Sequence, residues 1–104
     1  MVPYKVDFDS IPWETPAQGV RAKILKQDGK QLRLVEFTRE FVEPDWCQKG
    51  HFGYVLEGQL EIDFDGTRVL FAQGDGVFIP PGEAHKHMAR VLTDVVRLIL
   101  VEDV

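Results

Sequence analysis

Apolar and polar residues alternate with a period of two along most of the chain, which predicts β-strands rather than helices. The alternation is strongest over residues 60–65, where apolar and acidic side chains face opposite ways. Strands are predicted at residues 20–26, 31–37, 52–56, 60–64, 67–72, 77–79, 85–91 and 95–101. Asp28-Gly29 and Asp65-Gly66 favour tight hairpin turns. Short strands at this spacing predict an all-β fold, either an antiparallel barrel or a two-sheet sandwich.

The first 19 residues differ from the rest because three prolines interrupt them and no regular alternation appears. Their apolar residues are expected to pack as edge strands or against the barrel, and these are Val6, Phe8, Ile11 and Trp13. We therefore predict an N-terminal segment, residues 1–19, that packs on the barrel or at a dimer interface. One barrel domain, residues 20–104, follows it, since 104 residues suffice for a single core.

The charge and the cysteine content limit which binding partners and which cellular compartment are expected. The chain has 12 Lys and Arg against 17 Asp and Glu, for a net charge of −5. The basic residues are scattered, which argues against nucleic acid or an anionic membrane as a partner. The chain has no apolar run near the ~18 residues of a membrane span, and its first residues lack a secretory-signal pattern. The single cysteine, Cys47, has no internal disulfide partner, and a free thiol without an export signal predicts a cytoplasmic location.

The segment from Gly74 to His85 is the most informative part of the chain. Gly74-Asp75-Gly76 predicts a tight turn because glycine tolerates positive φ. A short apolar strand over residues 77–79 follows, and Pro80-Pro81-Gly82 ends it at a second corner. We expect His85 to open the next strand with its imidazole directed into the barrel.

A second group of metal-ligand residue types lies upstream, at Asp45, Cys47 and His51. Residues two apart in a strand share a face, so Asp45 and Cys47 can point the same way, as can His85 and His87. Thiolate and imidazole bind borderline metals such as Zn²⁺ and Fe²⁺, and carboxylates join mixed sites. The two groups together predict a metal or ligand site inside the barrel.

Both segments resemble the two sequence motifs of the cupin superfamily. The second motif is Gly, five residues, Pro-x-Gly, two residues, His, three residues, Asn. Four of its positions are matched by Gly74, Pro80, Gly82 and His85, whereas Ala89 replaces the Asn. Because the turn residues around His85 match the motif, we expect these turns to fix the position of His85 in the fold.

The first motif is matched in spacing rather than in ligand identity. The run from Tyr54 to Gly58 resembles one common in these proteins, and its Gly closes the motif. Asp45 and Cys47 occupy the positions of the family's paired histidines, and His51 occupies that of its glutamate. The opening Gly of the motif falls on Arg39.

The resemblance implies an antiparallel jelly-roll barrel with one cavity, commonly paired through a sheet as a homodimer. Family members usually hold a divalent metal through two histidines, a glutamate and a later histidine. Carried over by position, this implies Cys47, His51 and His85 as metal ligands, with Asp45 as an optional fourth. Such a donor set favours Zn²⁺ or Fe²⁺ over Mn²⁺. His87 would then act as the catalytic acid or base.

Three functions remain open. The first is a metal-binding cupin acting on a small molecule, in which the ion polarises a carbonyl or acidifies water. The second is a metal-free module that binds or senses a small molecule, consistent with the altered ligands. The third is a structural barrel used for dimerisation. Substrate, metal and reaction type are all open at this stage.

Each candidate residue also has a structural interpretation. Cys47 can be a small buried hydrophobe, His51 a hydrogen-bonded core histidine, and Asp45 a turn residue. A nucleophilic Cys47–His51 pair needs a bend, because four residues along a strand separate side chains by roughly 13 Å. The metal hypothesis needs the same bend, which the family motif implies near Gly50.

Overall fold

The structure, a computed structural model, describes residues 4–104, so the first three residues of the predicted N-terminal segment lie outside it. The described residues form β-strands and two short 3₁₀ turns, η1 (Phe8–Ser10) and η2 (Glu83–His85). The strands are β1 (Glu14–Ala17), β2 (Val20–Gln27), β3 (Lys30–Thr38), β4 (His51–Glu57), β5 (Gln59–Asp63), β6 (Arg68–Ala72), β7 (Gly76–Ile79), β8 (Met88–Val91) and β9 (Val95–Asp103).

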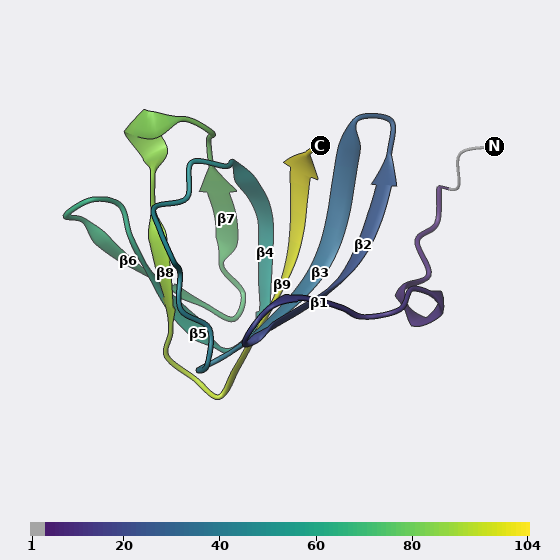
Figure 1. The fold of residues 1–104 in the computed structure, drawn as a ribbon, viewed down its shortest axis with the longest axis horizontal. Coiled ribbons are helices and arrows are strands. Elements are labelled where there is room, and N and C mark those ends of the chain that lie inside the picture. Colours follow the sequence, from purple (N-terminus) through teal and green to yellow (C-terminus); the bar gives the residue numbers. More distant parts are fainter. Residues whose placement is uncertain (1–3) are drawn as a thin grey trace.

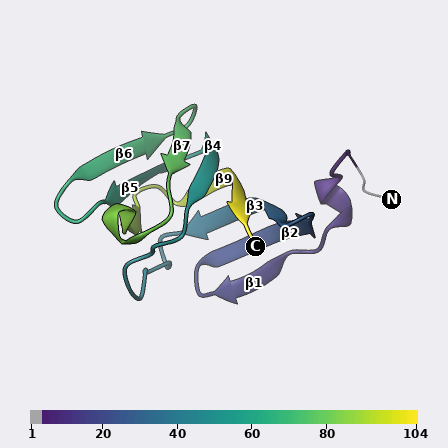
Figure 2. The ribbon, with the colours of Figure 1, turned by 90° about the horizontal axis from the view of Figure 1, so that it is seen from above.

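The strands form two antiparallel sheets. The larger has the order β1-β2-β3-β9-β4-β7, and the smaller has the order β6-β5-β8. In Figure 1 the smaller sheet stands on the left and the larger extends to the right. Seen from above, β7 and β4 lie between the smaller sheet and the side formed by β9, β3, β2 and β1 (Figure 2). The predicted all-β antiparallel jelly-roll architecture is confirmed.

Both predicted Asp-Gly turns are present. Asp28 and Gly29 have φ of 57° and 77° and join β2 to β3, with Gln27 opposite Lys30. Asp65 and Gly66 have φ of 61° and 111° between β5 and β6. Positive φ at both central residues gives the turn a twist that matches the flanking strands. These hairpins fix the register of β2 on β3 and of β5 on β6.

The core lies between the two sheets and follows from the period-two pattern. In β9, Val96, Leu98 and Leu100 are buried, whereas the residues between them are less so. Leu60 and Ile62 of β5 supply the facing layer from the smaller sheet. A strand with one buried face alternates in this way because successive side chains point to opposite sides.

One predicted strand begins later than expected. The strand expected at residues 85–91 begins only at Met88, because Glu83–His85 forms the η2 turn after Gly82 at φ 118°. The backbone N–H of His85 donates to the Gly82 carbonyl at 3.1 Å, and this turn breaks the extended chain.

The described part of the N-terminal segment contacts the edge of the larger sheet. It contains β1, which pairs with β2. The guanidinium of Arg21 lies 4.0 Å from the Trp13 ring centroid, and Lys23 Nζ donates to the Phe8 carbonyl at 2.8 Å. Outward-facing side chains of β2 therefore hold this segment against the sheet.

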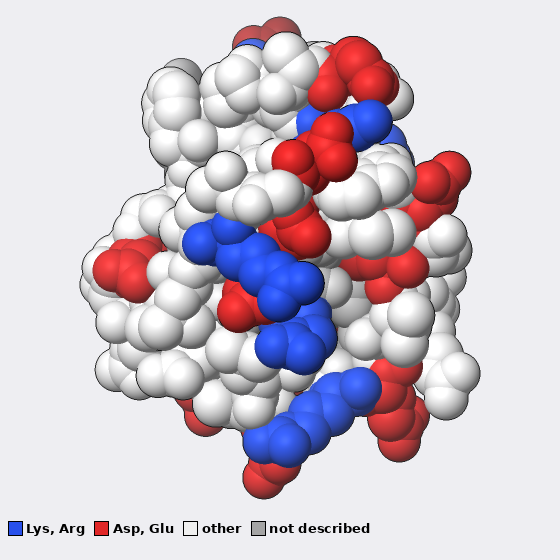
Figure 3. Space-filling view, turned by 90° about the vertical axis from the view of Figure 1, so that its left-hand side faces the viewer, with Lys and Arg blue, Asp and Glu red and all other residues white. Residues whose placement is uncertain are grey.

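The outer face of the smaller sheet is charged and of mixed sign. Figure 3 shows Lys and Arg interleaved with Asp and Glu on this side of the molecule. Ion pairs join Arg90 to Glu61 at 3.5 Å and Arg68 to Asp63 at 3.9 Å. This interleaving gives the face no single-sign field of the kind that attracts a polyanion. Within residues 4–104, no helix is both long enough and apolar enough to span a membrane.

Candidate metal centre

One end of the barrel interior brings together Cys47, His51 and His87. Their ligand atoms all lie within 4.8 Å of one another. Cys47 and His87 face each other across an isolated antiparallel bridge, with N–H···O distances of 2.8 and 3.0 Å. His51 is the first residue of β4, and His87 immediately precedes β8. The cluster therefore draws on both sheets and on the segment that enters β4.

A bend in the chain brings Cys47 close to His51, four residues further on. The Cys47 Sγ lies 3.5 Å from His51 Nε2. The bend passes Pro81 so closely that a Cβ built on Gly50 would lie 2.9 Å from Pro81 Cδ. The Gly82 N–H also donates to the Gln48 carbonyl at 2.9 Å. The required bend is present, and Gly50 leaves room for it.

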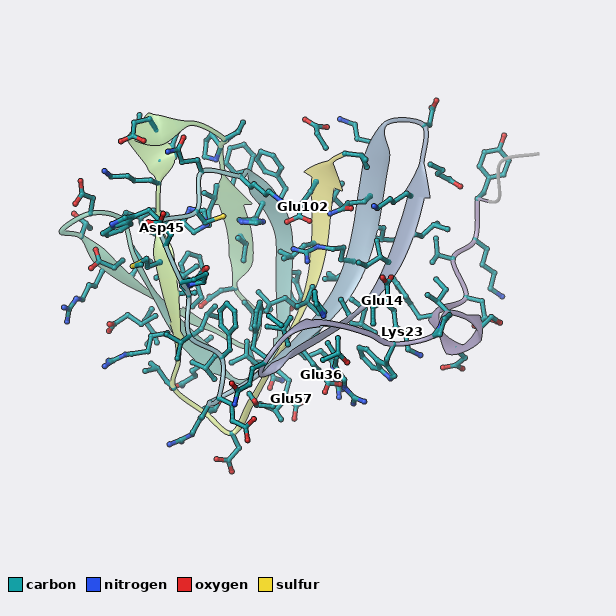
Figure 4. The ribbon with its side chains drawn as sticks, in the orientation of Figure 1. Glu14, Lys23, Glu36, Asp45, Glu57 and Glu102 are labelled. Atoms are coloured by element: carbon teal, nitrogen blue, oxygen red, sulfur yellow. The ribbon has the colours of Figure 1, made fainter. Side chains whose placement is uncertain are left out.

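Glu102 orients the His51 ring. The Glu102 carboxylate accepts a hydrogen bond from His51 Nδ1. Arg33 donates to the same carboxylate from Nε at 2.6 Å and from Nη2 at 2.9 Å, and Gln31 donates from Nε2 at 2.8 Å. Because Nδ1 binds the carboxylate, Nε2 is the nitrogen that faces Cys47, and a carboxylate in this role fixes the tautomer of a ligand histidine. Figure 4 shows Glu102 on β9, in the upper part of the larger sheet.

His87 is almost completely enclosed, with 2% of its surface exposed. Its Nδ1 lies 3.0 Å from the His85 carbonyl oxygen, so this nitrogen donates to the backbone and Nε2 is left for the cluster. The ring packs edge-on against His51, with centroids 5.1 Å apart. Its position is therefore fixed by the backbone bridge and by ring packing.

Hydrogen bonding in the cluster favours a thiolate beside an imidazolium. Hydrogen bonds from His51 and then His87 lower the pKa of Cys47 to about 5, against the opposing effect of burial. Burial lowers the pKa of His51, but hydrogen bonds to Cys47 and Glu102 outweigh it and raise that pKa to about 9. At neutral pH the sulfur is therefore deprotonated, as both a nucleophile and a metal ligand must be.

Glu43 borders the same cavity, and no pattern in the sequence pointed to it. Burial raises the pKa of its carboxyl, and the nearby Cys47 charge adds to the effect, whereas a hydrogen bond from the Ala89 N–H opposes it. Glu43 lies in the connection between β3 and β4, where an acidic residue is ordinary.

Glu102 and Arg33 did leave a signal in the strand pattern. Glu102 falls two residues after Leu100 and so continues the buried face of β9. Arg33 precedes Val35 on the inward face of β3 in the same way. A charge in an inward position is a recognisable mark of a functional or paired group.

The predicted site residues are only partly gathered here. Asp45 is exposed, and its Oδ1 accepts from the Trp46 N–H at 2.7 Å; Figure 4 shows it on the segment before β4. His85 lies on the exposed η2 turn and contributes its carbonyl to His87. The structure thus places His87, rather than His85, beside Cys47 and His51. The two histidines would share a face only in an extended strand, and the η2 turn prevents that.

The cluster opens onto a cavity of about 270 Å³. Most of its lining is apolar and comes from both sheets, including Phe37, Leu60, Phe71 and Leu98. Its charged lining residues are Arg33, Glu43 and Lys49. A small apolar chamber with a few polar groups at one place is the usual form of a small-molecule site.

Comparison with known proteins agrees with this architecture. The model of the Cupin domain family matches residues 43–102, more than half of the chain. The chain therefore belongs to the cupin family. No curated protein matches it.

Solved cupin structures share the fold at low identity. An RmlC-like cupin from Shewanella frigidimarina NCIMB 400 superposes with a TM-score of 0.74 at 19% identity, covering 98% of this chain and 91% of that one. KdgF from Halomonas sp. gives a TM-score of 0.69 at 21% identity, with coverages of 92% and 91%. HppE in its Fe(II) form gives 0.69 at 18% identity and covers 93% of this chain, but this chain spans only 58% of HppE.

Proposed function

We propose that this protein binds one divalent metal ion through Cys47, His51 and His87 and acts on a small molecule in the adjoining cavity. The observation that supports the proposal most directly is the convergence of the three ligand atoms within 4.8 Å. One sulfur and two imidazole nitrogens favour Zn²⁺ or Fe²⁺ over Mn²⁺. HppE, a structural relative, has been solved with Fe(II), which agrees with this preference.

The donor set fits such an ion. Ligands at 2.0–2.3 Å from a tetrahedral metal lie about 3.5 Å from each other, and the Cys47 Sγ and His51 Nε2 are 3.5 Å apart. Both histidines use Nδ1 for hydrogen bonds to other groups, so each keeps Nε2 for the ion. Three protein ligands also leave a coordination position for water or substrate, as in catalytic zinc sites.

A bound divalent ion would polarise a carbonyl or lower the pKa of a bound water. In this proposal His87 holds the metal, and this role replaces the acid–base role that its sequence position suggested. The Glu43 side chain borders the cavity and is placed to exchange a hydrogen bond with a molecule held there. Neither His85 nor Asp45 is given a ligand role.

Metal analysis of protein purified without a polyhistidine tag tests the proposal. We expect about one divalent ion per chain in the wild type and in His85→Ala, and strong loss of metal in Cys47→Ala and His87→Ala. His85→Ala is the matched control, because it removes an imidazole two residues from His87. Metal content that is low in the wild type, or equal in all four proteins with circular dichroism unchanged, would contradict the proposal.

The second candidate is a metal-free module that binds or senses a small molecule. It is favoured by the way the cluster satisfies its own hydrogen bonds, with Cys47 paired to His51 and His51 paired to Glu102. A thermal-shift series separates the two functions through linkage. Stabilisation by Zn²⁺ or Fe²⁺ that disappears in Cys47→Ala supports the metal centre. Stabilisation by metabolites alone supports the metal-free module.

We further propose that the chain forms a homodimer through the outer face of the larger sheet. Phe52 and Phe78 stack edge-on there at 4.7 Å, and the Phe78 side chain is 80% exposed. Tyr54 and Val101, on neighbouring strands, are partly exposed on the same face. Aromatic residues gathered on an open face are typical of an interface.

Sedimentation velocity tests the dimer. We expect Phe78→Ser to weaken it, whereas Val42→Ser should not, although Val42 is 77% exposed and also apolar. Val42 lies outside the sheets, in the connection before β4. A monomeric wild type at micromolar concentration would exclude the proposed interface.

A further inference from the structure

The lining of the cavity beside the cluster includes three charged side chains. Of its charged lining residues, Arg33 and Lys49 are cations and Glu43 is the acid. Arg33 and Lys49 also line a neighbouring surface hollow with Gln48 and Pro81. The two cations therefore stand where the interior meets the surface.

The two cations differ in whether a carboxylate of the protein already pairs with them. Arg33 directs Nε and Nη2 to the Glu102 carboxylate, so much of its charge is balanced within the protein. Lys49 is exposed and, among residues 4–104, its ammonium makes no ion pair or side-chain hydrogen bond. Lys49 is thus a cation without a paired carboxylate, two residues from Cys47, on the wall of a mostly apolar chamber.

From this arrangement we infer that the natural ligand is a small monocarboxylate with a compact apolar body, whose carboxylate is held at the cavity mouth by Lys49 beside Arg33. This inference rests on the proposed function, because it takes the cavity next to the cluster as the substrate site. The apolar body occupies the chamber formed by Phe37, Leu60, Phe71 and Leu98. At about 270 Å³ the chamber lies just below the usual size range of ligand pockets, which limits the body to a short branched chain or a single ring.

The charge of the surroundings favours a monoanion over a phosphate. Two carboxyl groups already border the place where this anion would lie, because Glu43 lines the chamber and Glu102 lines the neighbouring hollow beside Arg33. A dianion would meet stronger repulsion from these groups. The Arg33 guanidinium is also committed to Glu102, so the fork that commonly binds phosphate through two parallel hydrogen bonds is not available.

Matched acid and amide pairs test the inference on the metal-loaded protein. The probes are 3-methylbutanoate, phenylacetate and 3-phenylpropanoate, each compared with its neutral amide of nearly the same shape. Binding is measured by calorimetry for the wild type, Lys49→Gln and the control Lys26→Gln. Lys26 is exposed on β2 and lies outside the cavity, so its loss changes net charge by the same amount without touching the site.

We expect at least one acid to bind more tightly than its amide in the wild type and in Lys26→Gln. In Lys49→Gln the affinity for the acid should fall about fivefold, as for a partly exposed ion pair, while the affinity for the amide stays the same. A preference for the acid that survives in Lys49→Gln would assign carboxylate recognition to the metal alone and overturn the role of Lys49. Equal binding of acid and amide, or no binding of any pair below about 10 mM, would overturn the inference as a whole.

The metal content of the same samples separates this test from that of the proposed function. Protein that carries metal lost on Cys47→Ala but shows no acid preference would refute the carboxylate inference alone. Protein without such metal would refute the proposed centre, whatever it binds.

Discussion

Replacing Glu102 with Gln removes the charge that joins Arg33 to His51 while keeping the shape of the side chain. The Glu102 side chain is 6% exposed and that of Arg33 is 19% exposed. In the variant, the Arg33 guanidinium would remain in a largely enclosed place with its counter-charge gone. We therefore expect the change to destabilise the fold far more than the loss of a surface carboxylate.

The size of the effect follows from the titration of this carboxyl. Burial acts to raise its pKa, but hydrogen bonds from His51, Arg33 and Gln31 prevail and lower it from 4.5 to about 2. Since one pH unit corresponds to about 1.4 kcal/mol, the folded state holds the charged form more tightly by about 3 kcal/mol. Removal of one partner from a buried ion pair gives a similar range, about 3–5 kcal/mol. A loss near 3 kcal/mol in the free energy of unfolding is therefore expected at neutral pH.

Urea unfolding of the wild type, Glu102→Gln and Glu57→Gln measures this loss. Glu57 pairs with Arg97 at 3.5 Å, but both side chains are about half exposed, at 53% and 41%, so Glu57→Gln should cost less than about 1 kcal/mol.

The pH dependence provides an independent check. Because the Glu102 pKa is lower in the folded state, its contribution is present above pH 4.5 and is lost as the pH falls through about 2. The difference between wild type and Glu102→Gln should thus shrink to less than half at about pH 3. The reasoning fails if Glu102→Gln costs no more than Glu57→Gln, or if the difference is the same at both pH values.

Two further outcomes can be measured on metal-free protein. The ultraviolet absorbance of the Cys47 thiolate should titrate with a midpoint near pH 5, as its lowered pKa indicates. The substitution His51→Gln should move that midpoint upward. A wild-type midpoint at the ordinary thiol value would contradict the Cys47–His51 pair. Gly53→Ala should lower the free energy of unfolding by at least about 2 kcal/mol, because its Cβ would lie 1.8 Å from the Ile99 carbonyl oxygen. Gly76→Ala is the control on the adjacent strand, where the nearest atom would be 3.9 Å away, and equal losses would show that the contact does not set the cost.

Local chemistry was enough to predict most of the fold. The Asp28-Gly29 and Asp65-Gly66 turns depend only on the conformations that these two residue types allow, and both are where the sequence placed them. The strands around them follow from one-sided burial, which imposes the period of two. The prediction was wrong over residues 85–87, because a short 3₁₀ turn ends at His85 and the strand begins only at Met88. A turn of only three residues just after a Pro-Pro-Gly corner has no periodicity that would reveal it.

The site was less accessible to sequence reasoning, because long-range contacts build it. Cys47 and His51 were expected to meet at a bend, and they do so at 3.5 Å. His87 joins them through the backbone bridge to Cys47, a pairing that no local pattern encodes. Glu102 and Arg33 are separated by 69 positions and meet because β3 pairs with β9.

Along β3 and β9 the inward side chains change from apolar to charged, and this change links the stability of the fold to the candidate metal centre. On β9 the inward positions run from Val96 through Leu98 and Leu100 to Glu102, so a continuous alternation ends in a carboxylate. A buried carboxylate needs an opposite charge beside it, and the Arg33 guanidinium on β3 supplies that charge. His51 Nδ1 donates a hydrogen bond to Oε2 of the same carboxylate. His51 is thereby held in one orientation before any ligand arrives. A preformed site needs little reorganisation on binding, so a metal held here would add to the stability of a barrel that is already folded rather than drive its folding.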